Sequence, residues 1–206
     1  MRLAVLASGN GSNLGAIIET FPGAVVGVFC NRPQAYALER ARRAGIEACC
    51  CPRPGGHSRE AYDANLALQV RACRPDLVVL AGWMHILGPA FLTDLPVINL
   101  HPAWLPEDPS QDTVELPDGS WCPVFRGAHA LEDALERGVS YVGSSVHWVT
   151  QEVDRGRLIL REARPVLPGD TIETLRSRLL PMEHRLLPAA IRKVLGVPDG
   201  KCGAGR

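Results

Sequence analysis

The chain reads VINLHPAWLP at residues 97–106, where a short apolar run ends in an amide, an imidazole and two prolines. Side chains alternate between the two faces of a strand, so Asn99 and His101 are expected to project to the same side. Pro102 ends the strand, because its ring nitrogen cannot donate a hydrogen bond and its φ is fixed. The pair is therefore predicted at the carboxyl end of a strand, where open α/β sheets bind ligands. The same pattern also fits a polar strand end without a catalytic role.

Strand-like and helical segments alternate along the rest of the chain. Besides the strand that carries Asn99 and His101, strands are predicted at residues 3–7, 25–30, 46–51, 76–81, 141–150 and 158–162. Helices are predicted at residues 13–21, 34–44, from 58 onward, 128–137 and 171 to about 195, and a small hairpin around the turn 117–120. This order predicts an α/β fold: one domain with a mostly parallel twisted sheet, helices on both faces and mixed C-terminal strands.

Length and composition limit the partners that the chain can have. Its 206 residues, 46% of them hydrophobic, suffice for one domain with a full core, which we expect over residues 1–197 with an inserted loop at about 107–123 and a flexible tail at 198–206. Lys+Arg and Asp+Glu both number 22, so no net charge attracts nucleic acid or an anionic membrane. No apolar stretch is long enough to span a bilayer. We therefore expect neither a nucleic-acid nor a membrane partner.

The seven cysteines include no Cys-x-x-Cys pair with the spacing of metal ligands. The run at 49–51 lies in a predicted strand, so neighbouring side chains point in opposite directions and do not converge on one metal. No metal site is expected. The odd total and the lack of a secretory signal predict reduced thiols in a cytoplasmic protein.

Residues 8–12 form a glycine-rich turn, SGNGS, between the first strand and the first helix. Gly9 and Gly11 permit positive φ and a close approach of the backbone to a ligand, while amides at the start of the helix point at an anion. The spacing Gly9-x-Gly11-x-x-x-Gly15 misses the dinucleotide fingerprint by one residue, and no Gly-Lys-Ser/Thr follows. The turn therefore favours a single phosphate over a pyrophosphate, although an ordinary βα turn has the same composition.

Two further segments carry weaker signals. Residues 82–88, GWMHILG, follow the fourth strand and place large apolar side chains around one histidine. Such a loop either forms a wall for a flat heteroaromatic ring or packs into the core. Asp154 lies in the connection between the last two strands, where an aspartate is most often a turn residue.

Six segments, in their order and spacing, resemble the phosphoribosylglycinamide formyltransferase family, the folate-dependent formyltransferases of purine synthesis. They are residues 7–14 (ASGNGSNL), 58–63 (SREAYD), 80–87 (LAGWMHIL), 99–106 (NLHPAWLP), 146–149 (VHWV) and 154–156 (DRG). The resemblance covers nearly the whole chain and implies a Rossmann-like formyltransferase fold. It implies 10-formyltetrahydrofolate as co-substrate and 5-phosphoribosylglycinamide as acceptor, without a metal. We expect a cytoplasmic monomer or homodimer with small-molecule substrates only.

The resemblance also implies roles for individual residues. For binding the acceptor it implies Gly11, Ser12, Asn13 and Glu183. For binding the folate it implies Arg59, Met84, His85, Ile86, Leu87 and Asn99. For catalysis it implies Asn99, His101 and Asp154. In direct formyl transfer, Asn99 can donate to the developing oxyanion, while His101 contributes charge or shuttles a proton and Asp154 orients or charges it.

The chain departs from the family pattern at three places. Ala103 and Trp104 stand where the family usually has a serine and a leucine, and His85 stands where an arginine is common. The acidic segment at about 107–123 replaces a short loop, and we expect it to be a lid, an oligomer contact or an inert insertion.

Three other functions share part of this pattern. A methionyl-tRNA formyltransferase would imply a further C-terminal domain and a basic surface, neither of which the sequence shows. A formyltetrahydrofolate deformylase shares the Asn, His and Asp, but its usual form adds an N-terminal regulatory domain, whereas the first strand here begins at about Leu3. A non-catalytic folate- or phosphate-binding module would need none of the three catalytic side chains.

Overall fold

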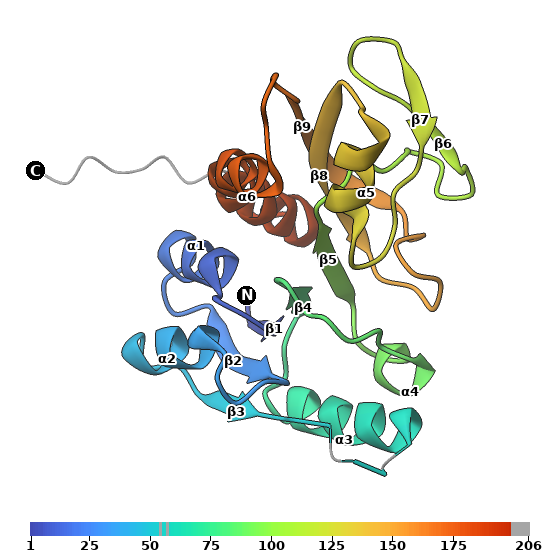
Figure 1. Cartoon of the computed structure of the whole chain (residues 1–206). Helices are drawn as coiled ribbons and strands as arrows, with labels where there is room; N and C mark the ends of the chain where they lie inside the picture. Colours follow the sequence, from blue (N-terminus) through green and yellow to red (C-terminus); the bar gives the residue numbers. More distant parts are fainter. Residues whose placement is uncertain (54, 57, 199–206) are drawn as a thin grey trace, which may run out of the picture.

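Seven strands form one sheet in the computed structural model, which describes residues 1–53, 55–56 and 58–198 (Figure 1). Their order across the sheet is β3-β2-β1-β4-β5-β8-β9. The strands are β1 (Leu3–Ala7), β2 (Val25–Cys30), β3 (Ala48–Cys50), β4 (Leu77–Leu80), β5 (Val97–His101), β8 (Tyr141–Trp148) and β9 (Leu158–Pro165). β1 to β5 are parallel, β8 runs antiparallel to β5, and β9 antiparallel to β8. The predicted mostly parallel sheet with mixed C-terminal strands is confirmed.

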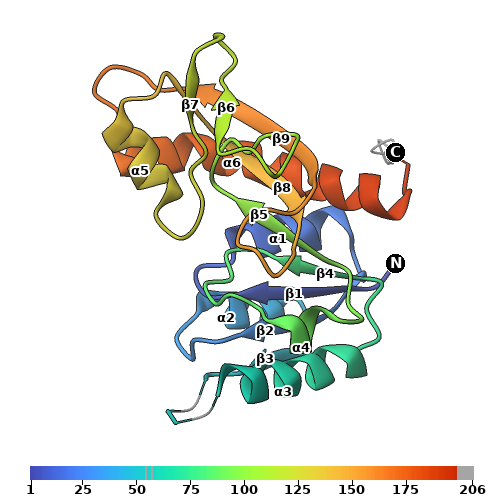
Figure 2. The ribbon, with the colours of Figure 1, turned by 90° about the vertical axis from the view of Figure 1, so that its right-hand side faces the viewer.

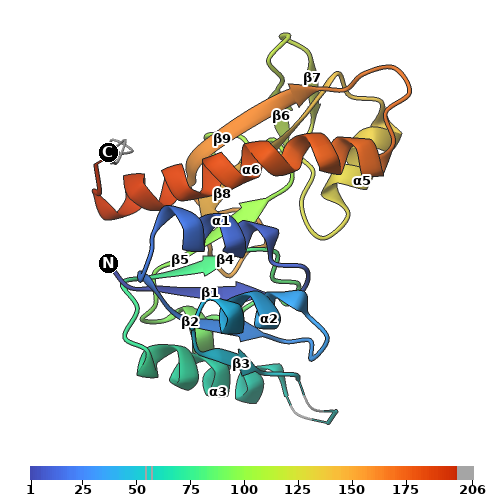
Figure 3. The same ribbon diagram turned by 90° about the vertical axis from the view of Figure 1, so that its left-hand side faces the viewer.

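Helices cover both faces of the sheet. They are α1 (Ser12–Thr20), α2 (Tyr36–Arg43), α3 (Arg59–Ala72), α4 (Pro89–Leu92), α5 (Ala130–Arg137) and α6 (Ile172–Leu195). One apolar cluster joins α1, α2 and α6 to one face of the central strands, and a second joins α3 and α4 to the other. Figure 3 shows α6 lying alongside α1 over the first of these faces.

The central strand β1 explains why two cores form. All five of its residues are buried, and their side chains alternate, so that Leu3, Val5 and Ala7 join the first cluster and Ala4 and Leu6 the second. An apolar run without alternation is what a parallel strand needs when helices cover both of its faces. The strand therefore holds the two layers together while its carboxyl end stays at one edge of the sheet.

The last strand is longer than predicted, because β9 pairs with β8 as far as Pro165. Its polar residues interrupted the apolar signal, but β9 is an edge strand, and an edge strand keeps one side exposed to solvent. The flexible tail predicted at residues 198–206 lies, apart from Pro198, outside the described residues.

The acidic insertion folds into a packed hairpin of β6 (Thr113–Glu115) and β7 (Trp121–Pro123), as the turn at 117–120 predicts. Its apolar side chains Val114, Leu116 and Cys122 form a third cluster with residues of α5 and α6. Figure 2 shows the hairpin at the end of the molecule opposite α3.

Trp104, one of the departures from the family pattern, ties the hairpin to the sheet. Its indole N–H donates to the Glu115 carbonyl at 3.0 Å, and the Arg161 guanidinium of β9 lies 4.0 Å above its ring. The unusual tryptophan and the insertion therefore belong together structurally.

The connection between β8 and β9 passes very close to β8 itself. A Cβ atom added to Gly156 would lie 1.5 Å from the Trp148 carbonyl oxygen, so only glycine fits there. The Trp148 N–H also donates to the Arg157 carbonyl at 3.0 Å, which holds this connection on the strand. Gly156 thereby fixes the path of the chain just after Asp154.

We expect Gly156→Ala to lower the free energy of unfolding by about 2 kcal/mol or more, since a methyl group must displace backbone rather than a flexible side chain. Urea-induced unfolding followed by circular dichroism measures the change. Gly55→Ala is the matched control, because a Cβ at Gly55 meets no atom within 4 Å. Equal midpoints for the two variants would contradict this packing.

Candidate active site

The turn after β1 and the loop after β4 meet at the carboxyl edge of the sheet. The Ser8 N–H donates to the Gly82 carbonyl at 3.0 Å, and the Ser8 hydroxyl accepts from the Met84 N–H at 2.9 Å. Ser8 is 2% exposed, so both bonds are shielded from water. The glycine-rich turn and the apolar loop are therefore fixed next to each other, beside the end of β5.

Three side chains from distant parts of the sequence converge at the end of β5. The Asp154 carboxylate lies 3.4 Å from Nδ1 of His101 and 3.5 Å from the Asn99 amide nitrogen, which donates to it. It also accepts the Gly127 N–H at 2.8 Å. Asp154 is thus a buried partner of the two strand residues rather than an ordinary turn aspartate.

The backbone of Asp154 has φ +52, in the left-handed region that side chains other than glycine seldom adopt. An aspartate tolerates this region better than most residues do. In this conformation the Asp154 carboxylate points toward the cluster. Backbone strain of this kind is most often found at functional sites.

His147 on β8 is a fourth member of this cluster, although the sequence predicts no role of its own for it. It is the register partner of Asn99 in the antiparallel pairing of β5 with β8, and it is 2% exposed. Its Nε2 lies 3.4 Å from the Asp154 carboxylate and 3.3 Å from the Asn99 amide nitrogen. Its Nδ1–H donates to the Trp148 carbonyl at 2.8 Å, because a carbonyl oxygen can only accept.

The environment of His101 favours its neutral form. Nε2 lies 3.0 Å from the Phe125 carbonyl and must carry a proton there, so the unprotonated Nδ1 of the neutral ring faces Asp154. Burial lowers the pKa of His101, while the Asp154 charge and the Phe125 carbonyl oppose that effect only in part. At neutral pH the ring is therefore a base beside an anion that stabilises its protonated form.

Asp154 remains ionised throughout the physiological range. Burial by itself would raise the pKa of this carboxyl, but the adjacent His147 and His101 side chains and the Gly127 N–H together lower it to about 2. A negative charge thus stays fixed within 3.5 Å of three nitrogen-bearing side chains.

One cavity, of about 350 Å³, opens from this cluster toward the apolar loop after β4. It is lined by Trp83, Met84, His85, Ile86 and Leu87 together with Asn99, His101, His147 and Asp154. Met84 and Ile86 are 51% and 46% exposed, which is unusual for such apolar side chains and typical of a wall that a ring compound covers.

Two residues of α3 lie near this loop without lining the cavity. Asp63, buried in α3, accepts the Gly88 N–H at 2.7 Å and so fixes the end of the loop. Burial lowers the pKa of His85, and the positive charges of Arg53 and of Arg59, the first residue of α3, lower it further. The expected folate residue Arg59 thus lies near the cavity, not in its wall.

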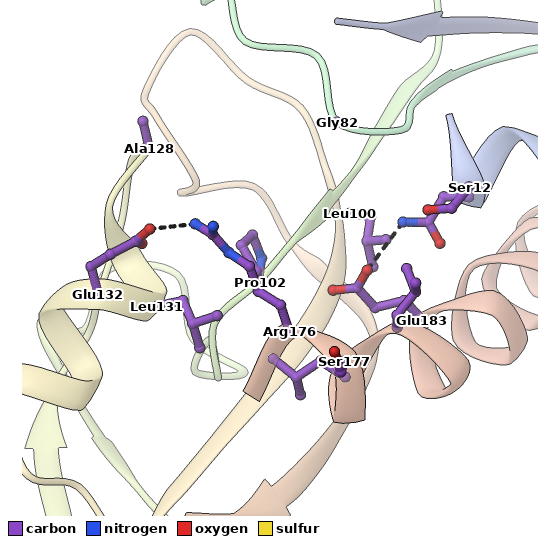
Figure 4. A pocket seen from close by; sticks show the side chains of 13 residues that line it. Ser12, Gly82, Leu100, Pro102, Ala128, Leu131, Glu132, Arg176, Ser177 and Glu183 are labelled. Atoms are coloured by element: carbon purple, nitrogen blue, oxygen red, sulfur yellow. Dashed lines mark hydrogen bonds and ion pairs between the residues drawn. The ribbon is translucent and has the colours of Figure 1, made fainter. Parts of the chain in front are cut away.

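A second cavity, of about 400 Å³, lies between the start of α1 and α6 (Figure 4). Glu183 of α6 accepts hydrogen bonds from the Asn13 amide at 3.1 Å and from the Ser144 hydroxyl at 2.8 Å, and Ser12 lies beside it. Oδ1 of Asn13 is buried and has no hydrogen-bond partner among the described residues. Figure 4 also shows Arg176 of α6 paired with Glu132 of α5 in this cavity.

Gly11 rather than Gly9 needs to be glycine in the turn before α1. Its φ is +74, and a Cβ there would lie 2.7 Å from the Ala37 Cβ, whereas Gly9 has no positive φ and no atom near its Cβ position. The left-handed conformation that glycine permits is therefore adopted at Gly11 and not at Gly9. Because α2 packs so closely, the turn has one path into α1.

The two cavities share four lining residues, Gly82, Leu100, Pro102 and Ala128. Leu100 and Pro102 flank His101 in the sequence, so the cavities adjoin at the end of β5. Two small molecules bound in them would therefore meet beside the cluster of polar side chains.

Neither metal ligands nor a membrane segment is found in the part of the chain that the structure describes. Residues 1–53, 55–56 and 58–198 contain no group of three or more His, Cys, Asp or Glu side chains placed to hold a metal ion. Within the same residues, no helix combines the length and apolarity that a bilayer crossing requires.

Comparison with known proteins points in one direction. The family model described as Formyl transferase matches residues 1–115 and 118–191. Phosphoribosylglycinamide formyltransferase of Escherichia coli is 40% identical over 198 residues, which are 93% of this chain and 85% of that protein. The enzyme of the same name from Schizosaccharomyces pombe is 39% identical over 219 residues, covering 94% of this chain and 96% of its own.

Solved structures give the same result. A glycinamide ribonucleotide transformylase from Symbiobacterium toebii matches with a TM-score of 0.82 and 43% identity, covering 93% of this chain and 86% of that one. A phosphoribosylglycinamide formyltransferase from Streptococcus pneumoniae matches with a TM-score of 0.81 and 37% identity, covering 94% and 98%.

The electrostatics of the cluster predict how His101 titrates. We expect NMR titration to give His101 a pKa below 6.5, and Asp154→Asn to lower it further, because the anion that favours the imidazolium is lost while burial remains. Asp118→Asn, which removes a carboxylate of the exposed hairpin turn, is the control that leaves the pKa unchanged. A pKa above 6.5, or one that does not respond to Asp154→Asn, would refute this account.

Proposed function

Because the chain belongs to the formyl transferase family, we propose that it transfers a formyl group from 10-formyltetrahydrofolate to the amine of 5-phosphoribosylglycinamide. The chain is an enzyme, a formyltransferase of purine biosynthesis, as the relatives that match nearly its whole length are. The main support for this proposal is the pair of adjoining cavities at the end of β5, which offer one site for each of two small-molecule substrates.

The first cavity suits the folate. A flat pterin ring fits against the apolar loop 83–87, where exposed Met84 and Ile86 gain a cover, and loop backbone groups supply hydrogen bonds for its edge. This explains why His85 can replace the arginine common in the family. Arg59, near the loop, attracts the carboxylates of the folate tail.

The second cavity suits the ribonucleotide. Gly11, Ser12 and Asn13 present backbone N–H groups at the start of α1, where the helix dipole also favours a phosphate. Glu183 can accept hydrogen bonds from ribose hydroxyls, and its present partners Asn13 and Ser144 keep it directed into the cavity.

Formyl transfer between the two substrates then needs no covalent bond to the enzyme. The amine attacks the formyl carbon, negative charge develops on the formyl oxygen, and the C–N bond to the folate breaks as that nitrogen is protonated. Asn99 donates a hydrogen bond to the oxyanion from a fixed position. His101 contributes charge or shuttles the proton from the amine to the folate nitrogen through Nδ1, its unprotonated nitrogen, and the Asp154 carboxylate beside Nδ1 stabilises the imidazolium.

We further propose that the enzyme works in the cytoplasm, as a monomer or homodimer, on these two small molecules without nucleic acid or membrane. The zero net charge and the odd number of cysteines, which predicts reduced thiols, support this proposal.

The direct test is to incubate the protein with 10-formyltetrahydrofolate, with and without 5-phosphoribosylglycinamide, and to identify the products by mass spectrometry. We expect formylated ribonucleotide and tetrahydrofolate only when both substrates are present. Formate released at the same rate without the ribonucleotide would instead identify a formyltetrahydrofolate deformylase, and tight binding without turnover a non-catalytic module.

We expect Asn99→Ala to lower kcat by about a hundred- to a thousandfold with little change in folate KM, because the lost hydrogen bond acts on the oxyanion of the transition state. Steady-state kinetics with both substrates measure the effect, and thermal unfolding verifies that the variant folds. His129→Ala is the control, since His129 is exposed and makes no capping hydrogen bond at α5. Wild-type turnover in a folded Asn99→Ala variant would rule out the assignment.

A further inference from the structure

One carboxylate of the acidic insertion joins the two loops that hold Asp154. Oδ1 of Asp112 accepts from Nη2 of Arg155 at 2.5 Å and from Nη1 of Arg126 at 3.0 Å. Arg126 lies in the loop between β7 and α5, and Arg155 in the connection between β8 and β9. A single oxygen atom of the hairpin segment therefore bridges two segments that are 29 residues apart in sequence.

Backbone carbonyls just before Asp112 complete this bridge. The Arg126 guanidinium donates to the Gln111 carbonyl at 2.7 Å, and that of Arg155 donates to the Pro109 and Ser110 carbonyls at 3.2 and 3.3 Å. The segment 109–112 thus surrounds both guanidinium groups with acceptors. Bonds with charged donors are the stronger kind, and several of them restrict both side chains at once.

Both arginines adjoin the groups that hold the catalytic carboxylate. Arg126 precedes Gly127, whose N–H donates to Asp154 at 2.8 Å, and Arg155 follows Asp154 directly. Asp154 itself has φ +52, a conformation that persists only where its surroundings impose it. The bridge at Asp112 therefore restrains the donor and the acceptor of this hydrogen bond from outside the cavity.

Restraint of the two arginines differs from the roles predicted for the insertion from the sequence, which were a lid, an oligomer contact or an inert insertion. Asp112 and the other residues of 107–123 line neither substrate cavity, so the segment is placed to act through its arginine partners and not as a wall of the site. Glu152 also lies 3.8 Å from Arg155, but it belongs to the same connection and does not tie it to the loop of Gly127. The Asp112 side chain is 73% exposed, so its ion pairs add little to global stability.

We propose that Asp112 is a positioning residue for formyl transfer, which holds the Asp154 carboxylate in its working position through Arg126 and Arg155. The proposal rests on the catalytic role of Asp154 proposed above. Displacement of a catalytic group by about 1 Å can cost a hundredfold in rate, so the restraint acts on kcat even though it lies outside the cavities.

The test compares Asp112→Asn with Asp118→Asn, which removes a carboxylate from the same hairpin that binds Ser120 and neither arginine. We expect Asp112→Asn to lower kcat about tenfold or more while the KM values of both substrates stay within about twofold. Asp112→Glu restores most of the rate, because the exposed site has room for a longer carboxylate. Asp118→Asn keeps wild-type kinetics. An unchanged kcat in Asp112→Asn, or a loss of equal size in Asp118→Asn, overturns the proposal.

Two further readouts separate this proposal from the proposed function. In the background of Asp154→Asn, we expect Asp112→Asn to cause no additional loss of kcat, and the same tenfold loss there would show that Asp112 acts elsewhere. Amide hydrogen exchange at Gly127 is expected to be faster in Asp112→Asn than in wild type, whether or not the protein has the proposed activity. Wild-type protein without formyl transfer refutes the proposed function, whereas unaltered Gly127 exchange refutes the restraint.

Discussion

A buried carboxylate without hydrogen-bond donors is too costly to keep in a folded protein, and the arrangement around Asp154 follows from that constraint. Its two oxygens accept from the Gly127 N–H and the Asn99 amide and face His101 and His147. These partners come from β5, β8 and the loop before α5, so satisfying one charge fixes how three separate segments meet. The same contacts keep Asp154 ionised, whereas burial keeps His101 neutral and the Asp154 charge stabilises its protonated form, as proton transfer requires.

The elements that depend on local sequence were predictable. The apolar runs of the parallel strands, the hairpin turn at 117–120 and the Thr171 cap of α6 each carry a local signal, and all are found. The alternation of Asn99 and His101 along β5 was likewise sufficient to place both near one ligand edge. The family resemblance contributed the partner, Asp154, which local evidence alone leaves as a turn residue.

What remained hidden depends on pairing and packing. His147 joins the site because β8 runs antiparallel to β5 in a register that sets it opposite Asn99, and a single sequence does not state that register. Its signal was a histidine inside the apolar segment 146–149. Asp63 was hidden because its N–H partner at Gly88 is 25 residues away. The sequence does not distinguish Gly9 from Gly11 either, because only the close approach of α2 to Gly11 does so. The packing of the insertion needs Trp104 and the α5–α6 surface, which are also distant in sequence.

Helix α6 contributes to two cores at once. Leu175, Leu179 and Met182 near its start pack with the hairpin and α5, whereas Leu186, Leu187 and Ile191 near its end pack with α1 and the parallel strands. Glu183 lies between these sets and lines the cavity between α1 and α6. Opening either half of the molecule would expose apolar surface of the same helix, so we expect the two halves to unfold together. We therefore expect the cavity between α1 and α6 to be lost in one cooperative event with the whole fold, and a ligand bound there to protect the hairpin end from proteolysis as effectively as the end that carries α1.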